Sequence, residues 1–223
     1  MDSIQRTVAK ISASLARFEG LHILVFGTTD ADSTLSRFDA SGVGHSGVTA
    51  VQRPIDTLSG QDTAPVRVVE IDREAVPEGR LAVAENPDAQ TPRAQACLNH
   101  PNGAVDLVEA ILCVPDAQIE QYAERYRRYT GCAARENDAV QLFDLEQSRV
   151  TLVPAGVLDT LLPGATAPPP PAFVGYAVAV RDLASARTLL ESNGLPVHEA
   201  PTGDIFVPGD AALGATVVFR QTG

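Results

Sequence analysis

The sequence contains no tryptophan and only 5% aromatic residues, so a packed core must be built mainly from Val, Leu, Ile and Ala. No apolar run approaches the roughly 18 to 20 residues that a membrane-spanning helix needs. The N-terminal stretch MDSIQRTVAK has an acid at its second position and no apolar segment, so it is not typical of a secretory signal. These absences predict a globular protein that does not enter a membrane.

Basic residues are also scarce, with 17 Lys and Arg against 28 Asp and Glu and a net charge of −11. Nucleic-acid binding depends on basic side chains that neutralise phosphates, so this balance argues against a nucleic-acid partner. It argues equally against an anionic membrane surface. The scattered charges are typical of a solvated surface.

The chain has three cysteines, Cys97, Cys113 and Cys132, and no CxxC spacing. This pattern predicts neither a disulfide scaffold nor a zinc site. We therefore expect a protein of the reducing cytoplasm.

The sequence repeats one pattern three times within its 223 residues. Each copy has a short apolar run, an acid, a segment of helical apolar spacing, and a glycine or Asn-Gly pair. The aligned acids are Asp30, Asp116 and Asp182, each at a strand-to-helix corner where a carboxylate can cap the helix. Asp32 competes with Asp30 for the first cap.

Short extended segments separated by turn residues follow each predicted helix, for example PVRVVEID and GRLAVAEN in the first copy. Each copy therefore predicts a β-α-β-β-β unit, and the whole chain predicts an α+β fold. The expected organisation is an amphipathic helix at 1–19, a first module at 20–86, a linker at 87–104, a second module at 105–162, a proline-rich linker at 163–172 and a third module at 173–223.

The N-terminal helix is predicted from Ile4, Val8, Ile11, Leu15 and Phe18, which repeat at spacings of four and three residues. One interpretation is a helix whose apolar seam packs against the body of the protein. The other is a self-association helix.

The third unit carries a corner pattern V-R-D-L-x-x-A in VAVRDLASARTLLESNGL, and the second carries a related CVPDAQIEQYAERYRRYTG. The stretch LNHPNGAVD forms the junction that leads into the second unit. These stretches resemble the vicinal oxygen chelate superfamily, the glyoxalase, bleomycin-resistance and dihydroxybiphenyl dioxygenase group. The HPNGA linker is similar to one in a glyoxalase-like subgroup. The resemblance covers residue 20 to the C-terminus and implies tandem βαβββ modules that pair into curved mixed sheets with half-barrel clefts.

The resemblance also implies a place for a divalent metal (Zn, Ni, Mn or Fe), whose ligands would come from the first and last strands of the modules. In the resembled family the first-strand ligand usually lies seven residues before the corner acid. The residues at that distance here are Ile23, Glu109 and Gly175, and only Glu109 can ligate. His22 is one residue out of register, and a shift of one residue reverses the face of a strand.

On the last strands the corresponding candidates are Glu85, Thr151 and Arg220. A complete three-ligand set cannot be identified, so a metal site is only a hypothesis. Its candidate ligands are His22, Glu85 and Glu109, the candidate catalytic residue is Glu85, and the candidate cleft residues are Glu109, Thr151 and Arg220. The plainer alternatives are a solvated strand end for Glu85, and for Glu109 a residue at a sheet rim or an arginine partner.

The resembled subgroup usually has four modules, whereas this chain has three. One module would then lack its mate and expose an apolar inner face. A second subunit, giving a homodimer, the helix at residues 2–18, or a longer natural protein would each resolve this, and we favour the homodimer.

The pairing we expect joins residues 107–161 with 173–221. The resemblance implies two candidate functions, and in both the protein binds a small-molecule ligand. One is a metal-dependent lyase, isomerase or dioxygenase. The other is a metal-free protein that binds and sequesters a small molecule, as bleomycin-resistance proteins do.

Overall fold

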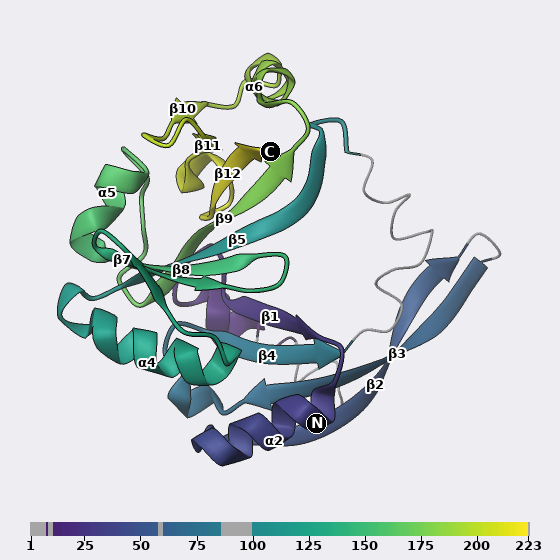
Figure 1. Ribbon diagram of the computed structural model, residues 1–223. Helices are drawn as coiled ribbons and strands as arrows, with labels where there is room; N and C mark the ends of the chain where they lie inside the picture. Colours follow the sequence, from purple (N-terminus) through teal and green to yellow (C-terminus); the bar gives the residue numbers. More distant parts are fainter. Residues whose placement is uncertain (1–7, 9–10, 58–59, 86–99, 223) are drawn as a thin grey trace.

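The computed structural model describes residues 8, 11–57, 60–85 and 100–222, which form two mixed β-sheets with helices packed against them (Figure 1). One sheet has four strands in the order β1-β4-β3-β2. The other has eight, in the order β10-β11-β12-β9-β5-β8-β7-β6. In these residues no helix is long and apolar enough to span a membrane.

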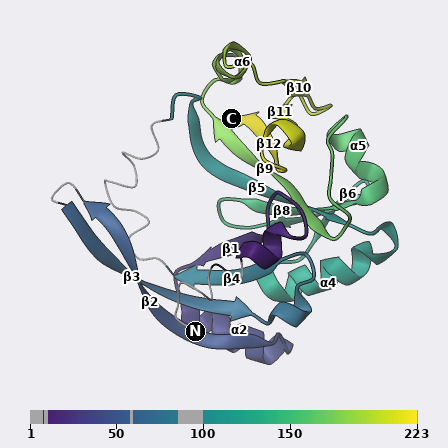
Figure 2. The same ribbon diagram turned by 180° about the vertical axis from the view of Figure 1, so that it is seen from behind.

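The four-stranded sheet belongs to the first module. Its first strand is parallel to its last, and β2 and β3 form a long antiparallel hairpin that extends beyond the body of the protein (Figures 1 and 2). The elements are β1 (Ile23–Thr28), α2 (Ala31–Ser41), β2 (His45–Thr57), β3 (Gly60–Ile71), a short turn η1 (Arg73–Ala75) and β4 (Arg80–Glu85).

The eight-stranded sheet repeats this arrangement twice. Strands β5-β8-β7-β6 and β9-β12-β11-β10 each copy the order β1-β4-β3-β2, and the two halves meet where β5 pairs antiparallel with β9. The expected fold class is confirmed, and the second and third modules pair as expected. The main elements are β5 (Ala104–Val114), α4 (Ile119–Thr130), β6 (Arg135–Asn137), β7 (Val140–Asp144), β8 (Arg149–Pro154), α5 (Leu158–Leu161), β9 (Ala172–Val180), α6 (Leu183–Ser192), β10 (His198–Glu199), β11 (Ile205–Val207) and β12 (Thr216–Gln221).

Two of the three corner acids cap their helices. The Asp30 carboxylate accepts a hydrogen bond from the Ser33 amide at the start of α2, and Asp182 accepts from two amides at the start of α6. Asp116 does not, and this expectation was wrong. Asp116 begins a 3₁₀ turn that delays the helix to Ile119, and its carboxylate accepts from the Gly156 amide instead.

The helix ends are confirmed. Gly42 and Gly131 follow α2 and α4 with positive φ values of 66° and 77°, and Gly194 follows α6 with a φ of 74°. Glycine takes this left-handed conformation without the steric penalty of a side chain, which is why it ends these helices.

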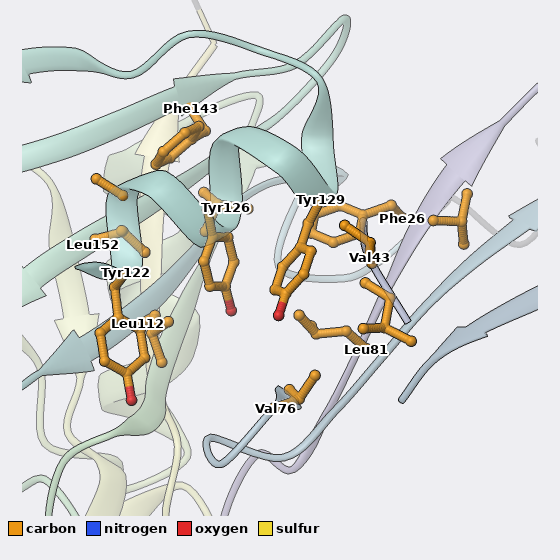
Figure 3. Close-up of a cluster of buried hydrophobic side chains, with 14 of the residues drawn as sticks. Phe26, Val43, Val76, Leu81, Leu112, Tyr122, Tyr126, Tyr129, Phe143 and Leu152 are labelled. Atoms are coloured by element: carbon orange, nitrogen blue, oxygen red, sulfur yellow. The ribbon is translucent and has the colours of Figure 1, made fainter. Parts of the chain in front are cut away.

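Helix α4 lies between the two sheets and joins the first module to the second. Its tyrosines Tyr122, Tyr126 and Tyr129 are buried in one apolar cluster with residues of both modules, as Figure 3 shows for Leu81 and Leu112 on either side. The first and second modules therefore share a core.

The N-terminal helix is described only in part. Residues 11–15 are helical, Val8, Ile11 and Leu15 are exposed, and Ile4 lies outside the described residues. Whether this helix self-associates stays a prediction, as does the division of the chain into modules and linkers at the boundaries given above.

Candidate functional site

Three candidate residues meet on the inner face of the eight-stranded sheet, the side opposite α4 and α6. Glu109 lies on β5, Thr151 on the neighbouring β8 and Arg220 on β12 of the third module. The Thr151 hydroxyl donates to Glu109 Oε1, and Arg220 Nη1 donates to Glu109 Oε2 over 2.7 Å. Both carboxylate oxygens of the buried Glu109 are thus engaged.

Asp204 is a fourth member that the sequence analysis missed. It lies in the turn before β11, and its Oδ2 accepts from Nε of Arg220 over 2.9 Å and forms an ion pair with Nη2, also at 2.9 Å. We call Glu109, Thr151, Asp204 and Arg220 the inner-face cluster. It links two strands of the second module to the last strand and a turn of the third.

Burial and charge act in opposite directions on Arg220. Burial alone would lower the pKa of its guanidinium, but the bonds and charges of Asp204 and Glu109 raise it overall. Arg220 therefore stays protonated between two carboxylates.

Apolar side chains pack over the rest of the inner face. Helix α5, which the sequence did not predict, places Leu158 on this side, and Leu162 follows it. They pack with residues of both modules, among them Ile111, Val153, Val174, Phe206 and Val218.

The first-strand position of the third module has no room for a side chain. A Cβ on Gly175 would overlap the backbone oxygen of Thr216 on the adjacent β12. The lack of a ligand at this position is thus imposed by the close approach of two strands.

Glu85 lies on the face of its sheet that α2 covers. It shares the α2 face of β4 with Leu81 and Val83, since alternate residues of a strand point the same way. Its Oε2 accepts from the Ala31 amide over 2.8 Å and from Arg67 over 3.1 Å. Glu85 is therefore an acceptor at the start of α2, and a solvated strand end is not its role.

His22 precedes β1 and is buried against Phe18, with ring centroids 4.2 Å apart. Its Nε2 lies 2.9 Å from the backbone oxygen of Phe18, and its Nδ1 has no partner among the described residues. The expected ligand trio of His22, Glu85 and Glu109 is not brought together, because each residue is engaged in a different place.

The inner-face cluster does not fit a divalent metal. It holds two carboxylates, but a guanidinium lies between them and already uses their oxygens. Within residues 8, 11–57, 60–85 and 100–222, no group of three or more His, Cys, Asp or Glu is placed to hold a metal ion. Of the alternatives considered for Glu109, the structure shows the pairing with an arginine, Arg220.

A second candidate site is the open face of the four-stranded sheet, the side opposite α2. It contains a hollow of about 400 Å³. Ile23, Val25 and Val51 on this face are about half exposed, at 51%, 50% and 43%. The apolar lining consists of Ile23, Val25, Val51, Val68 and Ala82.

Four polar side chains complete the lining of the hollow: Ser46, Thr49, Glu70 and Arg80. Arg80 of β4 forms an ion pair with Glu70 of β3, and the Ser46 hydroxyl accepts from the Glu70 amide over 3.1 Å. The open face therefore offers an apolar floor with one charged pair. This combination suits a small ligand that is mostly apolar and has one polar group.

Comparisons with known proteins agree with the repeated βαβββ architecture. The sequence pattern of the glyoxalase-like domain matches residues 3–130, more than half of the chain. The chain therefore belongs to the glyoxalase-like domain family, and its membership of the vicinal oxygen chelate superfamily is confirmed. None of the curated proteins matches the chain significantly.

Two solved structures with TM-scores above 0.5 support the fold at low sequence identity, and a third is similar over part of the chain. A mutant of 4-hydroxymandelate synthase from Streptomyces coelicolor matches 95% of this chain and 74% of its own, with a TM-score of 0.56 and 15% identity. A hypothetical protein from Staphylococcus aureus matches 88% of this chain with a TM-score of 0.53 and 11% identity, and this chain spans 63% of its length. Methylmalonyl-CoA epimerase from Mycobacterium tuberculosis matches 54% of this chain and 90% of its own at 16% identity, with a TM-score of 0.41.

Proposed function

We propose that the chain binds a small, mostly apolar molecule on the open face of its first module and needs no metal to do so. The observation that carries the proposal is the hollow of about 400 Å³ with its apolar floor and the Arg80–Glu70 pair. Pockets for small ligands typically have volumes of roughly 300 to 1,000 Å³, apolar walls and a few polar groups. The metal-dependent enzyme considered from the sequence has less support, because its candidate ligands are engaged elsewhere.

The chemistry of the lining favours a ligand with an aromatic or branched apolar body. Val25, Val68 and Ala82 form a floor of small side chains from three adjacent strands. Arg80 and Glu70 could each exchange their mutual contact for one with a polar group of the ligand. Sequestration without turnover, as considered from the sequence, requires nothing further.

The proposal is tested with 1-anilinonaphthalene-8-sulfonate, a dye with an aromatic body and one anionic group. The wild-type protein should bind it and increase its fluorescence. Ala82→Phe fills the hollow and should weaken binding at least tenfold, whereas Ala184→Phe, the same change on exposed α6, should not. Equal binding by both variants would contradict the location, and loss of wild-type binding after EDTA treatment would contradict metal independence.

We also propose that a second copy of the chain lies beside the open face, giving a homodimer. Strand β1 occupies the place in its module that β5 and β9 occupy in theirs, and those two strands pair antiparallel with each other. In the described part of the chain β1 pairs only with β4, so its other edge is available. A twofold pairing of β1 with its copy would extend the open face into an eight-stranded sheet.

Sedimentation of the protein tests this assembly. The wild type should sediment with twice the mass of one chain, and Val25→Glu should convert it to single chains because the substitution places charges next to the joint. Leu213→Glu, a matched change at a site that is 79% exposed, should leave the mass unchanged. A single-chain mass for the wild type would rule out the homodimer and favour cover from within the chain or from another protein.

The expected cytoplasmic location remains part of this proposal. Cys113 and Cys132 carry free thiols, which is usual in a reducing compartment. Burial raises the pKa of the Cys113 thiol to about 11, so this thiol would also be slow to oxidise.

A further inference from the structure

We infer that the guanidinium of Arg220 serves as a built-in cation on the inner face of the eight-stranded sheet, in the place where related modules would direct ligands at a divalent metal. The positions involved are those identified above, on the first strand of the second module and on the last strands of the second and third modules. This inference is independent of ligand binding on the first module.

The oxygen atoms around Arg220 support this inference. Glu109 Oε2 accepts from Nη1 on one side of the guanidinium, at 2.7 Å. On another side Asp204 Oδ2 accepts from Nε at 2.9 Å and forms an ion pair with Nη2 at 2.9 Å. Thr151 adds a hydroxyl on the far oxygen of Glu109. Two carboxylates and a hydroxyl are the oxygen ligands that a hard divalent cation prefers.

The low exposure of the two acids explains why a cation is needed. The side chains of Glu109 and Asp204 are only 8% and 13% exposed, so water screens their charges poorly. Two carboxylates directed at one point repel each other unless a positive charge lies between them. Arg220 supplies that charge from β12, and it ties the third module to the second at the same time.

The same geometry explains why a free metal ion would not enter. A divalent ion would have to displace a covalently attached cation that uses the same oxygens. If Arg220 loses its charge but keeps much of its bulk, the two acids and Thr151 should become an oxygen-rich site for such an ion.

Manganese(II) alone is the probe for this test, followed by the loss of its free electron paramagnetic resonance signal. Wild-type protein should show no Mn²⁺ binding that depends on Glu109. Arg220→Met should bind one equivalent at least tenfold more tightly than the wild type, and its thermal midpoint should rise with Mn²⁺ while that of the wild type does not. Arg220→Lys keeps the charge and should behave as the wild type does.

The double variant Arg220→Met with Glu109→Gln identifies the ligands, because it should lose the acquired binding. One Mn²⁺ bound by the wild type and lost in Glu109→Gln would overturn the inference. So would a folded Arg220→Met protein that binds no better than the wild type. If Arg220→Met does not fold alone, refolding in MnCl₂ but not in NaCl of equal ionic strength supports the inference, and failure in both overturns it.

Discussion

Arg125 of α4 donates through one nitrogen, Nη2, to both carboxylate oxygens of Glu78, at 2.6 and 2.7 Å. Glu78 lies in the turn before β4 and is fully buried, so this ion pair crosses the joint between the first and second modules. The Tyr126 hydroxyl donates to the same carboxylate over 3.0 Å. Helix α4 therefore contacts the first module through a buried ion pair as well as through apolar packing.

The surroundings of Arg125 keep its guanidinium protonated. Burial alone would lower the pKa of Arg125, but the charge and hydrogen bonds of Glu78 raise it overall. The Tyr122 ring lies under the guanidinium, 4.3 Å from its centroid, and adds a cation–π contact. At the C-terminal end of α4, Arg37 of the first module donates to the carbonyl oxygen of Arg128 over 2.6 Å. This bond gives a partner to one of the last helix carbonyls, which have none within the helix.

Removing the arginine should therefore weaken the joint strongly. Arg125→Met leaves the Glu78 carboxylate buried without its counter-charge, and breaking a buried pair in this way costs about 3 to 5 kcal/mol. Urea unfolding followed by circular dichroism should show a lower free energy of unfolding. We expect the first module to unfold in a separate transition at a lower urea concentration than the rest of the protein.

Arg127→Met on the same helix is the matched control. Arg127 pairs with Glu124 on the surface, where both side chains are more than half exposed. Its removal should leave the urea midpoint within experimental error. Equal midpoints for the Arg125 and Arg127 variants would show that the buried pair does not hold the modules together.

A second prediction concerns two glycines in equivalent first strands. Gly175→Ala would force a methyl group against the Thr216 backbone oxygen, whereas a Cβ on Gly27 meets nothing within 4 Å. Neither position requires a positive φ, so the difference is one of space. Gly175→Ala should lower the free energy of unfolding by about 1 to 3 kcal/mol.

Gly27→Ala should leave the stability unchanged or raise it slightly, because alanine restricts the unfolded chain. Thermal unfolding of the two variants beside the wild type measures the difference. If Gly175→Ala is as stable as Gly27→Ala, strands β9 and β12 are farther apart than the structure places them. The first-strand position of the third module could then accept a ligating side chain.

The comparison of sequence and structure separates local from non-local information. The caps at Asp30 and Asp182 and the glycine after each helix were predictable, since a helix end depends on a few neighbouring residues. The α5 helix was not, because its four residues, Leu158–Leu161, are too short to show a helical period. Asp116 failed as a cap because the turn it starts bonds to Gly156, 40 residues away.

The candidate sites show the same limit. Glu109 and Arg220 were chosen by strand position, and pseudo-symmetry brings them together across 111 residues. Asp204 could not be found, because its turn has no repeated pattern and only the folded sheet places it beside Arg220. Glu85 lies on the face of β4 that α2 covers, which was not predictable because a count along a strand does not fix which side is covered by a helix.

The last prediction concerns the pH dependence that Asp182 gives to α6. The Ser185 hydroxyl, at 2.6 Å, and then the amides of Ser185 and Ala184 lower the pKa of Asp182 below its ordinary 3.8. The folded protein therefore releases this proton more readily than the unfolded chain. The resulting stability is fully present above pH 3.8 and is lost as the pH falls through the lower folded value.

Asp182→Ala should consequently lower the urea midpoint at pH 7, and its difference from the wild type should shrink as the pH falls below about 4, the ordinary aspartate pKa. Asp182→Asn keeps an oxygen that can cap the helix but cannot titrate, so it should recover most of the stability at pH 7. Asp210→Ala, at an exposed aspartate outside the helix, should change the midpoint little at either pH. A difference between Asp182→Ala and the wild type that stays constant into acid would mean that the carboxylate charge plays no part in holding the start of α6, and that its oxygen contributes only as a neutral acceptor.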